Sequence, residues 1–219
     1  MKTIAIIPAR GGSKRLPDKN RLDFGGIPLL AHSILYALRH PEIIDGVYVS
    51  TDSVEIADIA IQFGAEVIMR PSKISGDSEP TVSALAHVLE NIVTVENVIL
   101  LQPTNPLRPA NLLENAFATF VGGKHDSLFS VSRNHHKLGT ISDNIFKPFN
   151  YKIGQRSQDL EPLFFENGLL YITKAALIQQ QTIISENAFP FEVNHLFSNI
   201  DIDTQEDFDL AQIILKHRS

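Results

Sequence analysis

The stretch that decides the fold is residues 3–20, TIAIIPARGGSKRLPDKN. Its first five residues, 3–7, form a continuous apolar run, which is the pattern of a short strand buried on both faces of a parallel sheet. Glycines and cations follow where that strand ends. Because open α/β sheets bind ligands at the carboxyl ends of their strands, this stretch predicts both a parallel sheet and the place of its ligand site.

The rest of the chain alternates between strand-like and helix-like segments. Strands are expected at residues 46–50, 66–69, 97–101 and 127–132, and helices at 30–38, 56–63, 81–92 and from about 109. This rhythm predicts a mostly parallel sheet with helices on both faces. Residues from about 139 to 190 are turn-rich and hairpin-like, which predicts an inserted lid or dimerisation arm. A last strand near 195–200 and a last helix at 204–216 complete a single domain over residues 1–219.

Composition and charge argue against several classes of protein. The chain has 219 residues, of which 43% are hydrophobic, enough for a sizeable core in one domain. It has no cysteine, which excludes disulfides and thiolate metal sites. A net charge of −6 without a long basic stripe argues against a nucleic-acid partner. Because no run resembles a membrane span or an export signal, we expect a cytoplasmic location and no membrane partner.

The loop after the first strand concentrates positive charge. Four cations fall within ten residues, at Arg10, Lys14, Arg15 and Lys19. Gly11 and Gly12 let the backbone approach a ligand closely and turn N–H groups toward it. Arginine offers a planar fork to phosphate oxygens and lysine a mobile point charge, so the loop predicts a grip on nucleotide phosphates. Its spacing matches neither the P-loop nor the G-x-G-x-x-G pattern, and a glycine turn with a solvated basic segment is the alternative.

A pair of carboxylates follows the last expected strand. Asp201 and Asp203 flank the apolar Ile202, so in an extended chain both carboxylates point to the same side. Two hard oxygen ligands in this arrangement suit Mg²⁺, which usually keeps several waters and bridges to substrate phosphates. Helix capping is the alternative for Asp203, because Asp203-x-x-Glu206 matches a capping box.

Other loop residues carry weaker signals. Asp52 follows the second strand, where a capping box makes a helix cap the simpler interpretation. Gln102 and Thr104 lie in a loop stiffened by prolines, which suits a hydrogen-bonding wall for a polyol substrate. The neighbouring His135 and His136 do not form a metal site by themselves.

Taken together, the chain resembles the cytidylyltransferases that activate nine-carbon 2-keto acids, the CMP-sialic acid (acylneuraminate) synthetase family. The matching segments are IIPARGGSKRLPDKN (6–20), VSTD (49–52), GAEVIMRP (64–71), LLQPTNPLR (100–108), ENGLLYI (166–172) and IDIDT (200–204). They cover nearly the whole chain in the family's order and spacing. The resemblance implies a three-layer α/β sandwich of the nucleotide-diphospho-sugar transferase type, with a mostly parallel central sheet, an inserted dimerisation arm and a homodimeric enzyme.

The resemblance also implies a reaction, of the kind used in cell-surface glycan biosynthesis. The anomeric hydroxyl of a nonulosonate attacks the α-phosphorus of CTP with the help of Mg²⁺, pyrophosphate leaves, and a CMP-sugar forms. By position, the nucleotide pocket would be lined by Arg10, Gly11, Gly12, Ser13, Lys14, Lys19, Asn20, Arg70 and Thr81. The sugar would face Gln102, Thr104, Asn167, Gly168 and Tyr171.

The same resemblance implies the catalytic groups. Asp201 and Asp203 would hold Mg²⁺, Lys14 and Mg²⁺ would offset charge on the leaving pyrophosphate, and Arg10 is expected among the catalytic residues with Lys14 and Asp203. Asp203, or a metal-bound water, is the candidate proton acceptor.

The chain departs from the family pattern in the sugar loop. Many members have an arginine two residues before the Asn-Gly, where this chain has Phe165, so a cation for the sugar is missing or comes from elsewhere, with Arg156 as a candidate. A CMP-Kdo-type synthetase, or a cytidylyltransferase for another 2-keto sugar, is an alternative, although residues 102–106 lack the acidic residue which the Kdo group uses. A non-catalytic nucleotide-binding relative is a remote alternative, because Lys14 and the carboxylate pair are intact.

Overall fold

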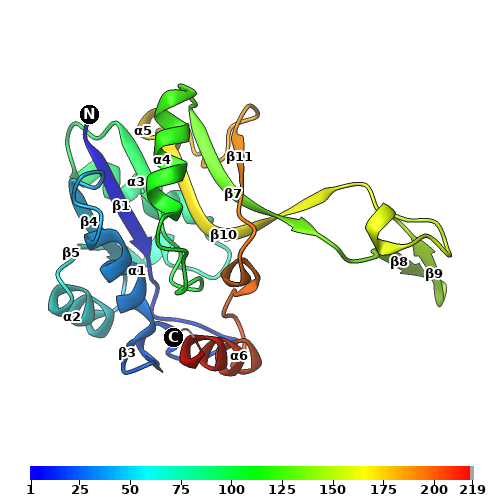
Figure 1. Cartoon of the computed structure of the whole chain (residues 1–219). Coiled ribbons are helices and arrows are strands. Elements are labelled where there is room, and N and C mark those ends of the chain that lie inside the picture. The colour runs from blue at the N-terminus through cyan, green and yellow to red at the C-terminus, as the bar shows by residue number, and fades with distance from the viewer. Residues whose placement is uncertain (218–219) are drawn as a thin grey trace.

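The computed structural model describes residues 1–217 and is built around a seven-stranded sheet in the order β11-β7-β10-β6-β1-β4-β5 (Figure 1). The strands on one side run parallel: β6 (Asn97–Leu100), β1 (Thr3–Pro8), β4 (Gly46–Thr51) and β5 (Glu66–Met69). On the other side β10 (Leu163–Lys174) runs antiparallel to β6 and to β7 (Ser127–Asn134), and β11 (Phe189–Glu192) runs parallel to β7. The expected mostly parallel sheet is confirmed.

Strand β1 shows why the sheet is covered on both faces. Its residues Ile4, Ala5, Ile6 and Ile7 are all 0% exposed, and alternate side chains enter opposite cores. One core is formed with α1 (Leu29–Leu38), α2 (Val54–Gln62) and α4 (Leu112–Gly122). The other is formed with α3 (Thr81–Asn91) and α5 (Ala175–Gln179). The result is the expected three-layer sandwich.

A third, smaller core lies under the last helix, α6 (Gln205–Lys216). It includes Phe24 from the short hairpin of β2 (Asp23–Phe24) and β3 (Ile27–Pro28), and Leu107 from the loop after β6. The segment that precedes α6 is thereby anchored against that loop. Short 3-10 turns complete the body: η1 (Lys19–Arg21), η2 (Ser72–Ile74) and η4 (Leu196–Asn199).

A hairpin of β8 (Gly139–Ser142) and β9 (Ile145–Pro148) projects far from the body, followed by the turn η3 (Ser157–Asp159) (Figure 1). The range expected for this arm, 139–190, does not leave the body as a whole. Strand β10 lies between β6 and β7, and its residues Leu169 to Ile172 are buried. The apolar run of β10 belongs to the central sheet because only burial on both faces removes it from water.

The strand expected near residues 195–200 is wrong. Those residues form η4, and the edge strand is β11 at 189–192. The ring of His195 accepts a hydrogen bond from the backbone N–H of Phe197 at 3.2 Å, which starts a turn instead of a strand.

Two helix caps lie one residue beyond their expected positions. Ser53, and not Asp52, caps α2 through a backbone N–H of the first turn. Thr204, and not Asp203, caps α6, in a reciprocal capping box with Asp207. Asp52 and Asp203 are therefore available for other contacts.

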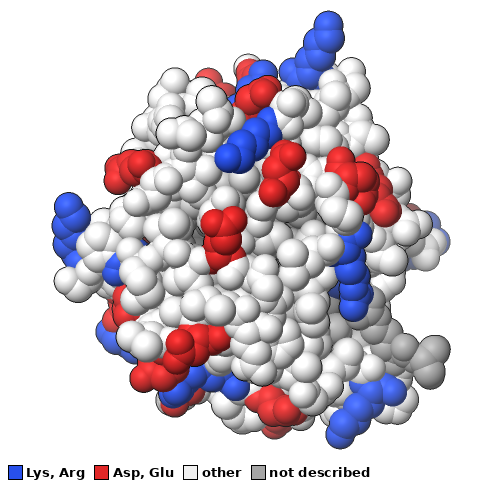
Figure 2. All heavy atoms as spheres, turned by 90° about the vertical axis from the view of Figure 1, so that its left-hand side faces the viewer, with Lys and Arg blue, Asp and Glu red and all other residues white. Residues whose placement is uncertain are grey.

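The surface on the side of β5 and α2 carries mixed charge. Figure 2 shows acidic and basic side chains interspersed on this face, without the basic patch that binding to a phosphate backbone uses.

Replacing Gly168 is predicted to destabilise the protein. Gly168 has a φ of +73° in the irregular part of β10, and a Cβ there would come within 2.6 Å of Asn105 Oδ1 and 3.1 Å of Gln102 Oε1. We expect Gly168→Ala to lower the free energy of unfolding by about 1–3 kcal/mol, measured by urea denaturation. Gly122→Ala is the control and should be neutral or slightly stabilising, because a Cβ added at this helix end would meet no heavy atom within 4 Å apart from its chain neighbours and its own helix backbone. Equal effects of the two substitutions would contradict this account.

Candidate active site

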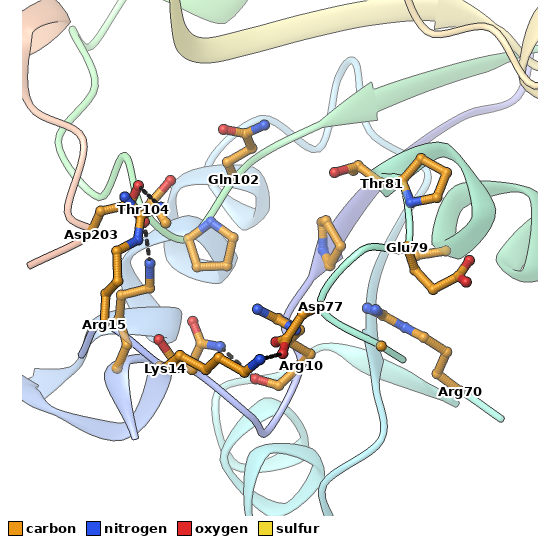
Figure 3. Close-up of a pocket in the computed structure, with 18 of the residues that line it drawn as sticks. Arg10, Lys14, Arg15, Arg70, Asp77, Glu79, Thr81, Gln102, Thr104 and Asp203 are labelled. Atoms are coloured by element: carbon orange, nitrogen blue, oxygen red, sulfur yellow. Dashed lines mark hydrogen bonds and ion pairs between the residues drawn. The ribbon is translucent and has the colours of Figure 1, made fainter. Parts of the chain in front are cut away.

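A cavity of about 520 Å³ lies at the carboxyl ends of the parallel strands. Four stretches that are distant in the sequence line it: residues 8–20 from the end of β1, 70–84 from the end of β5 into α3, 102–104 after β6, and 201–203 before α6. Figure 3 shows Arg70 and Thr81 on one side, Arg15, Thr104 and Asp203 on the other, and Arg10, Lys14 and Asp77 between them. The loops that the sequence places at strand ends do converge.

Most of the predicted site residues line this cavity: Arg10, Ser13, Lys14, Lys19, Asn20, Arg70, Thr81, Gln102, Thr104, Asp201 and Asp203. Gly11 instead lines an adjoining cavity beside Asp52. The lining of neither cavity includes Gly12, Asn167, Gly168 or Tyr171.

Asn167 and Tyr171 are turned into the protein. The side-chain amide of Asn167 donates to Ser132 Oγ at 2.9 Å and accepts from Ser130 Oγ at 2.6 Å, so its polar atoms are used internally. The Tyr171 hydroxyl donates to Glu166 at 2.5 Å, and the residue is only 4% exposed. These two side chains therefore do not line this cavity, and their polar atoms find the internal partners that buried polar groups need. That they face a sugar stays a prediction. Gly168 packs against Gln102 and so shapes the cavity from behind.

Two of the loop cations share one carboxylate. Arg10 and Lys14 both form ion pairs with Asp77, which comes from the turn before α3 (Figure 3). These two positive charges hold the pKa of the Asp77 carboxyl below its usual value, with Lys14 contributing most. An anion therefore already lies against the cations that the sequence assigns to phosphate.

The shape of the first loop is fixed from behind. The backbone N–H of Gly11 donates to Asp52 Oδ1 at 2.8 Å, and the Asn20 amide donates to the carbonyl of Arg10 at 3.1 Å. Asp52 is thus a support for the loop, and its interpretation as a helix cap is wrong. A Cβ on Gly11 would meet Ser53 Cβ at 3.0 Å, so this glycine permits the close approach.

Arg70 is anchored at the end of β4. Its guanidinium donates to the Ser50 carbonyl at 2.7 Å and to the Ser50 hydroxyl at 3.2 Å. Burial lowers the pKa of Arg70, although the charge of Asp52 opposes this shift. Arg70 is therefore held rigidly at the rim of the cavity beside Glu79 (Figure 3).

Asp203 is held by two cations. Its carboxylate accepts from Lys19 Nζ at 2.9 Å and from Arg15 at 2.7 Å. Lys19 is almost buried, with its side chain 11% exposed, and it also donates to the carbonyl of Ile202 at 2.8 Å. Lys19 therefore positions the carboxylate segment instead of standing free for a ligand.

Asp201 lies on the same side of the segment as Asp203, because the intervening Ile202 is 0% exposed. Although Asp201 is exposed toward the cavity, loss of hydration on its protein side raises the pKa of its carboxyl. The charge of Asp203 adds to this rise, and a hydrogen bond from Thr104 opposes it. Two carboxylates on one polar cavity form a donor set that fits a hard divalent cation, because such a cation would relieve the repulsion between them.

No sequence signal predicts three residues that belong to the site. Asp77 and Glu79 line the cavity from an exposed turn whose composition, SGDSEP, indicates only a loop. Asn105 lies inside the quoted segment 100–108, but its partners are up to 95 residues away, so only the folded chain reveals them.

A parallel α/β sheet with a cation-lined cavity at its strand ends is the arrangement of an α/β protein that binds its ligand at the carboxyl ends of the strands. The sequence model of the cytidylyltransferase family matches residues 4–217, and the chain belongs to that family. It is accordingly a nucleotidyltransferase.

Relatives confirm the resemblance to enzymes that form CMP-nonulosonates. The chain is 35% identical to the CMP-N,N'-diacetyllegionaminic acid synthase of Legionella pneumophila, over 99% of this chain and 97% of that protein. It is 32% identical to the pseudaminic acid cytidylyltransferase of Campylobacter jejuni, over 99% and 97%. It is also 32% identical to an N-acylneuraminate cytidylyltransferase of Streptococcus agalactiae, of which it covers 52%.

Solved structures share the fold. A CMP:2-keto-3-deoxy-manno-octonic acid synthetase complexed with CTP has a TM-score of 0.77 at 18% identity, covering the whole of both chains. A 4-diphosphocytidyl-2C-methyl-D-erythritol synthase has a TM-score of 0.73 at 16% identity, covering 98% of each. None of the helices within residues 1–217 has the length and apolar character of a membrane span.

Removing the Asp77 carboxylate is predicted to strengthen phosphate binding. Asp77 competes with any incoming anion for Arg10 and Lys14, so Asp77→Asn should tighten binding of inorganic tripolyphosphate about two- to fivefold. Calorimetric titration measures this affinity. Glu79→Gln removes the same charge from the same cavity, but Glu79 forms no ion pair within the described residues 1–217. This control should therefore increase the affinity for tripolyphosphate less than Asp77→Asn does. Weaker binding by Asp77→Asn would show that Asp77 supports the cations instead.

Asp201→Asn is predicted to stabilise the protein at neutral pH. Because the folded state raises the pKa of Asp201 above its ordinary value of 3.8, ionising this group costs stability as pH rises. The variant should therefore have the higher urea midpoint at neutral pH, and its advantage should shrink as the pH falls and vanish below about pH 3, where the carboxyl is protonated in both the folded and the unfolded state. An advantage that does not change with pH would contradict the assignment.

Proposed function

We propose that this chain transfers CMP from CTP to the anomeric hydroxyl of a nine-carbon 2-keto acid of the sialic acid type, releasing pyrophosphate. The observation that carries the proposal is a single cavity lined by the cation-rich loop, by the carboxylate pair and by the polar side chains of Gln102 and Thr104. The three most informative relatives, named for legionaminic, pseudaminic and N-acylneuraminic acids, support this class of acceptor.

The nucleotide half of the cavity is the side that holds Arg10, Lys14, Arg70 and Thr81. Arg10 and Lys14 would exchange Asp77 for the triphosphate, which places fixed positive charge beside the phosphorus that reacts. Arg70 and Thr81 would lie near the base and ribose. Such a site works by positioning and by neutralising charge, and it needs no covalent intermediate with the protein.

The acceptor half is the side of Gln102, Thr104 and the carboxylates. The acceptor oxygen forms a bond to the α-phosphorus. The bond between that phosphorus and the oxygen that bridges it to the β-phosphorus breaks, and pyrophosphate leaves. The hydroxyl proton would pass to a base on this side of the cavity, for which Asp203 is the candidate. Asp201 and Asp203 would hold Mg²⁺, which would offset the charge that builds on the leaving group.

The projecting arm, residues 139–159, supports a homodimer. It carries exposed apolar side chains, with exposed fractions of 76% at Ile141, 60% at Ile145, 74% at Phe149 and 87% at Ile153. A surface of this kind on a projecting hairpin marks a contact with another protein. Arg156 lies on the arm and is paired with Asp159 at 2.8 Å, so as the missing sugar-side cation it would have to reach the cavity of a second copy.

An assay of pyrophosphate release tests the reaction. With Mg²⁺ and a matrix of four nucleotides, we expect turnover with CTP only. The acids should include N-acetylneuraminic, deaminated, legionaminic-type, pseudaminic-type and eight-carbon 2-keto acids, and we expect turnover with a nine-carbon acid. Asp203→Asn should abolish turnover without loss of fold. Turnover with a sugar 1-phosphate, or with the eight-carbon acid alone, would overturn the proposal.

The dimer has its own test. Ile153→Asp should convert a dimer into a monomer in light scattering after gel filtration, because it places a charge in an apolar contact. Ile61→Asp changes an equally apolar residue, 64% exposed on α2, and should leave the dimer unchanged. A monomeric wild-type chain at micromolar concentration would contradict this prediction.

A further inference from the structure

Asn105 is a fully buried amide that connects two walls of the cavity. It is 0% exposed, and its Nδ2 donates to two backbone carbonyls, those of Ile200 at 2.7 Å and Asn167 at 3.2 Å. Ile200 begins the segment that carries Asp201 and Asp203. Asn167 begins the turn in β10 that packs behind the acceptor side of the cavity.

The residues around Asn105 reinforce this connection. The backbone N–H of Ile202 donates to the carbonyl of Thr104 at 2.8 Å, so the carboxylate segment is bonded to the loop after β6 at two successive points. On the other side, Gly168 packs so closely that an added Cβ would lie 2.6 Å from Asn105 Oδ1. The Asn105 backbone N–H donates to the carbonyl of Gln102 at 3.2 Å, which closes the loop on itself.

We propose that Asn105 is a positioning residue that sets the carboxylate segment in register with the acceptor wall. Because it does not line the cavity, it acts through Asp201 and Asp203 on one side and through Gly168 and Gln102 on the other. The effect of Asn105 on catalysis rests on the proposed function. The structural coupling of residues 200–203 to residues 167–168 does not depend on that function.

The chain supplies a matched control in Asn97. This residue is also buried, 3% exposed, and its amide donates to Thr3 Oγ1 at 3.2 Å. It lies at the start of β6, at the opposite end of the strand that leads into the loop of Asn105. Asn97→Ala therefore removes a buried amide from the same sheet without touching either wall of the cavity.

The first measurement is amide hydrogen exchange of Asn105→Ala and Asn97→Ala. In Asn105→Ala we expect exchange to accelerate about tenfold in both segments, 166–170 and 198–204, because each loses a hydrogen bond to the same side chain. Neither segment should change in Asn97→Ala. Acceleration in only one segment, or in both variants alike, would overturn the coupling.

The second measurement separates positioning from stability. In Asn105→Ala, the KM for the 2-keto acid and the Mg²⁺ concentration for half-maximal rate should each rise about tenfold. Calorimetric affinity for CTP without metal should change less than about twofold, since Arg10 and Lys14 are not bonded to Asn105. Asn97→Ala should change none of these quantities. Unchanged KM and Mg²⁺ requirement in Asn105→Ala would refute the positioning role.

A milder variant covers the case in which Asn105→Ala does not fold. Asn105→Ser keeps one donor where the amide has two, and it should give the same pattern at smaller size. If the wild-type chain turns over no 2-keto acid, the proposed function fails, while the exchange comparison still decides the coupling.

Discussion

The buried guanidinium of Arg108 is the contact on which the site depends. It is 2% exposed and donates to the carbonyls of Leu169 at 2.7 Å and Gln102 at 2.9 Å, and to Ser33 Oγ at 3.0 Å. Burial lowers the pKa of Arg108 to about 10, so it remains charged at neutral pH. One side chain thus joins β10, α1 and the loop after β6, and a buried charge with such partners is costly to displace.

This anchor explains why a polar cavity can form at the end of an apolar sheet. With the loop after β6 fixed, its residues Thr104 and Asn105 offer hydrogen bonds to the segment that carries the two aspartates. The first loop approaches from the other side and brings Lys19 to Asp203. Cations and carboxylates of the cavity are therefore paired with one another before any ligand enters, and the site is organised by the protein's own ion pairs.

The parallel sheet and the convergence of loops could be predicted from the sequence because both follow from local patterns. The run of residues 4–7 requires burial on both faces, and cations after a strand mark its carboxyl end. The helix caps and the strand that were predicted at the wrong positions depend on which of several neighbouring residues forms a given hydrogen bond. Ser53 displaces Asp52 as a cap, and the ring of His195 replaces a strand with a turn. The ion pairs of Asp77 and the partners of Asn105 are set by tertiary contacts, which no local pattern encodes.

The central claim is that the hydroxyl of a 2-keto acid attacks the α-phosphorus of CTP in this cavity. The most direct measurement is ³¹P NMR of the product formed from CTP and an acid labelled with ¹⁸O at its anomeric hydroxyl. The account predicts that the label is retained in the bridge between sugar and phosphorus, seen as an isotope shift of the single CMP resonance, with unlabelled pyrophosphate. Label in the pyrophosphate, or an unlabelled CMP product, would contradict it.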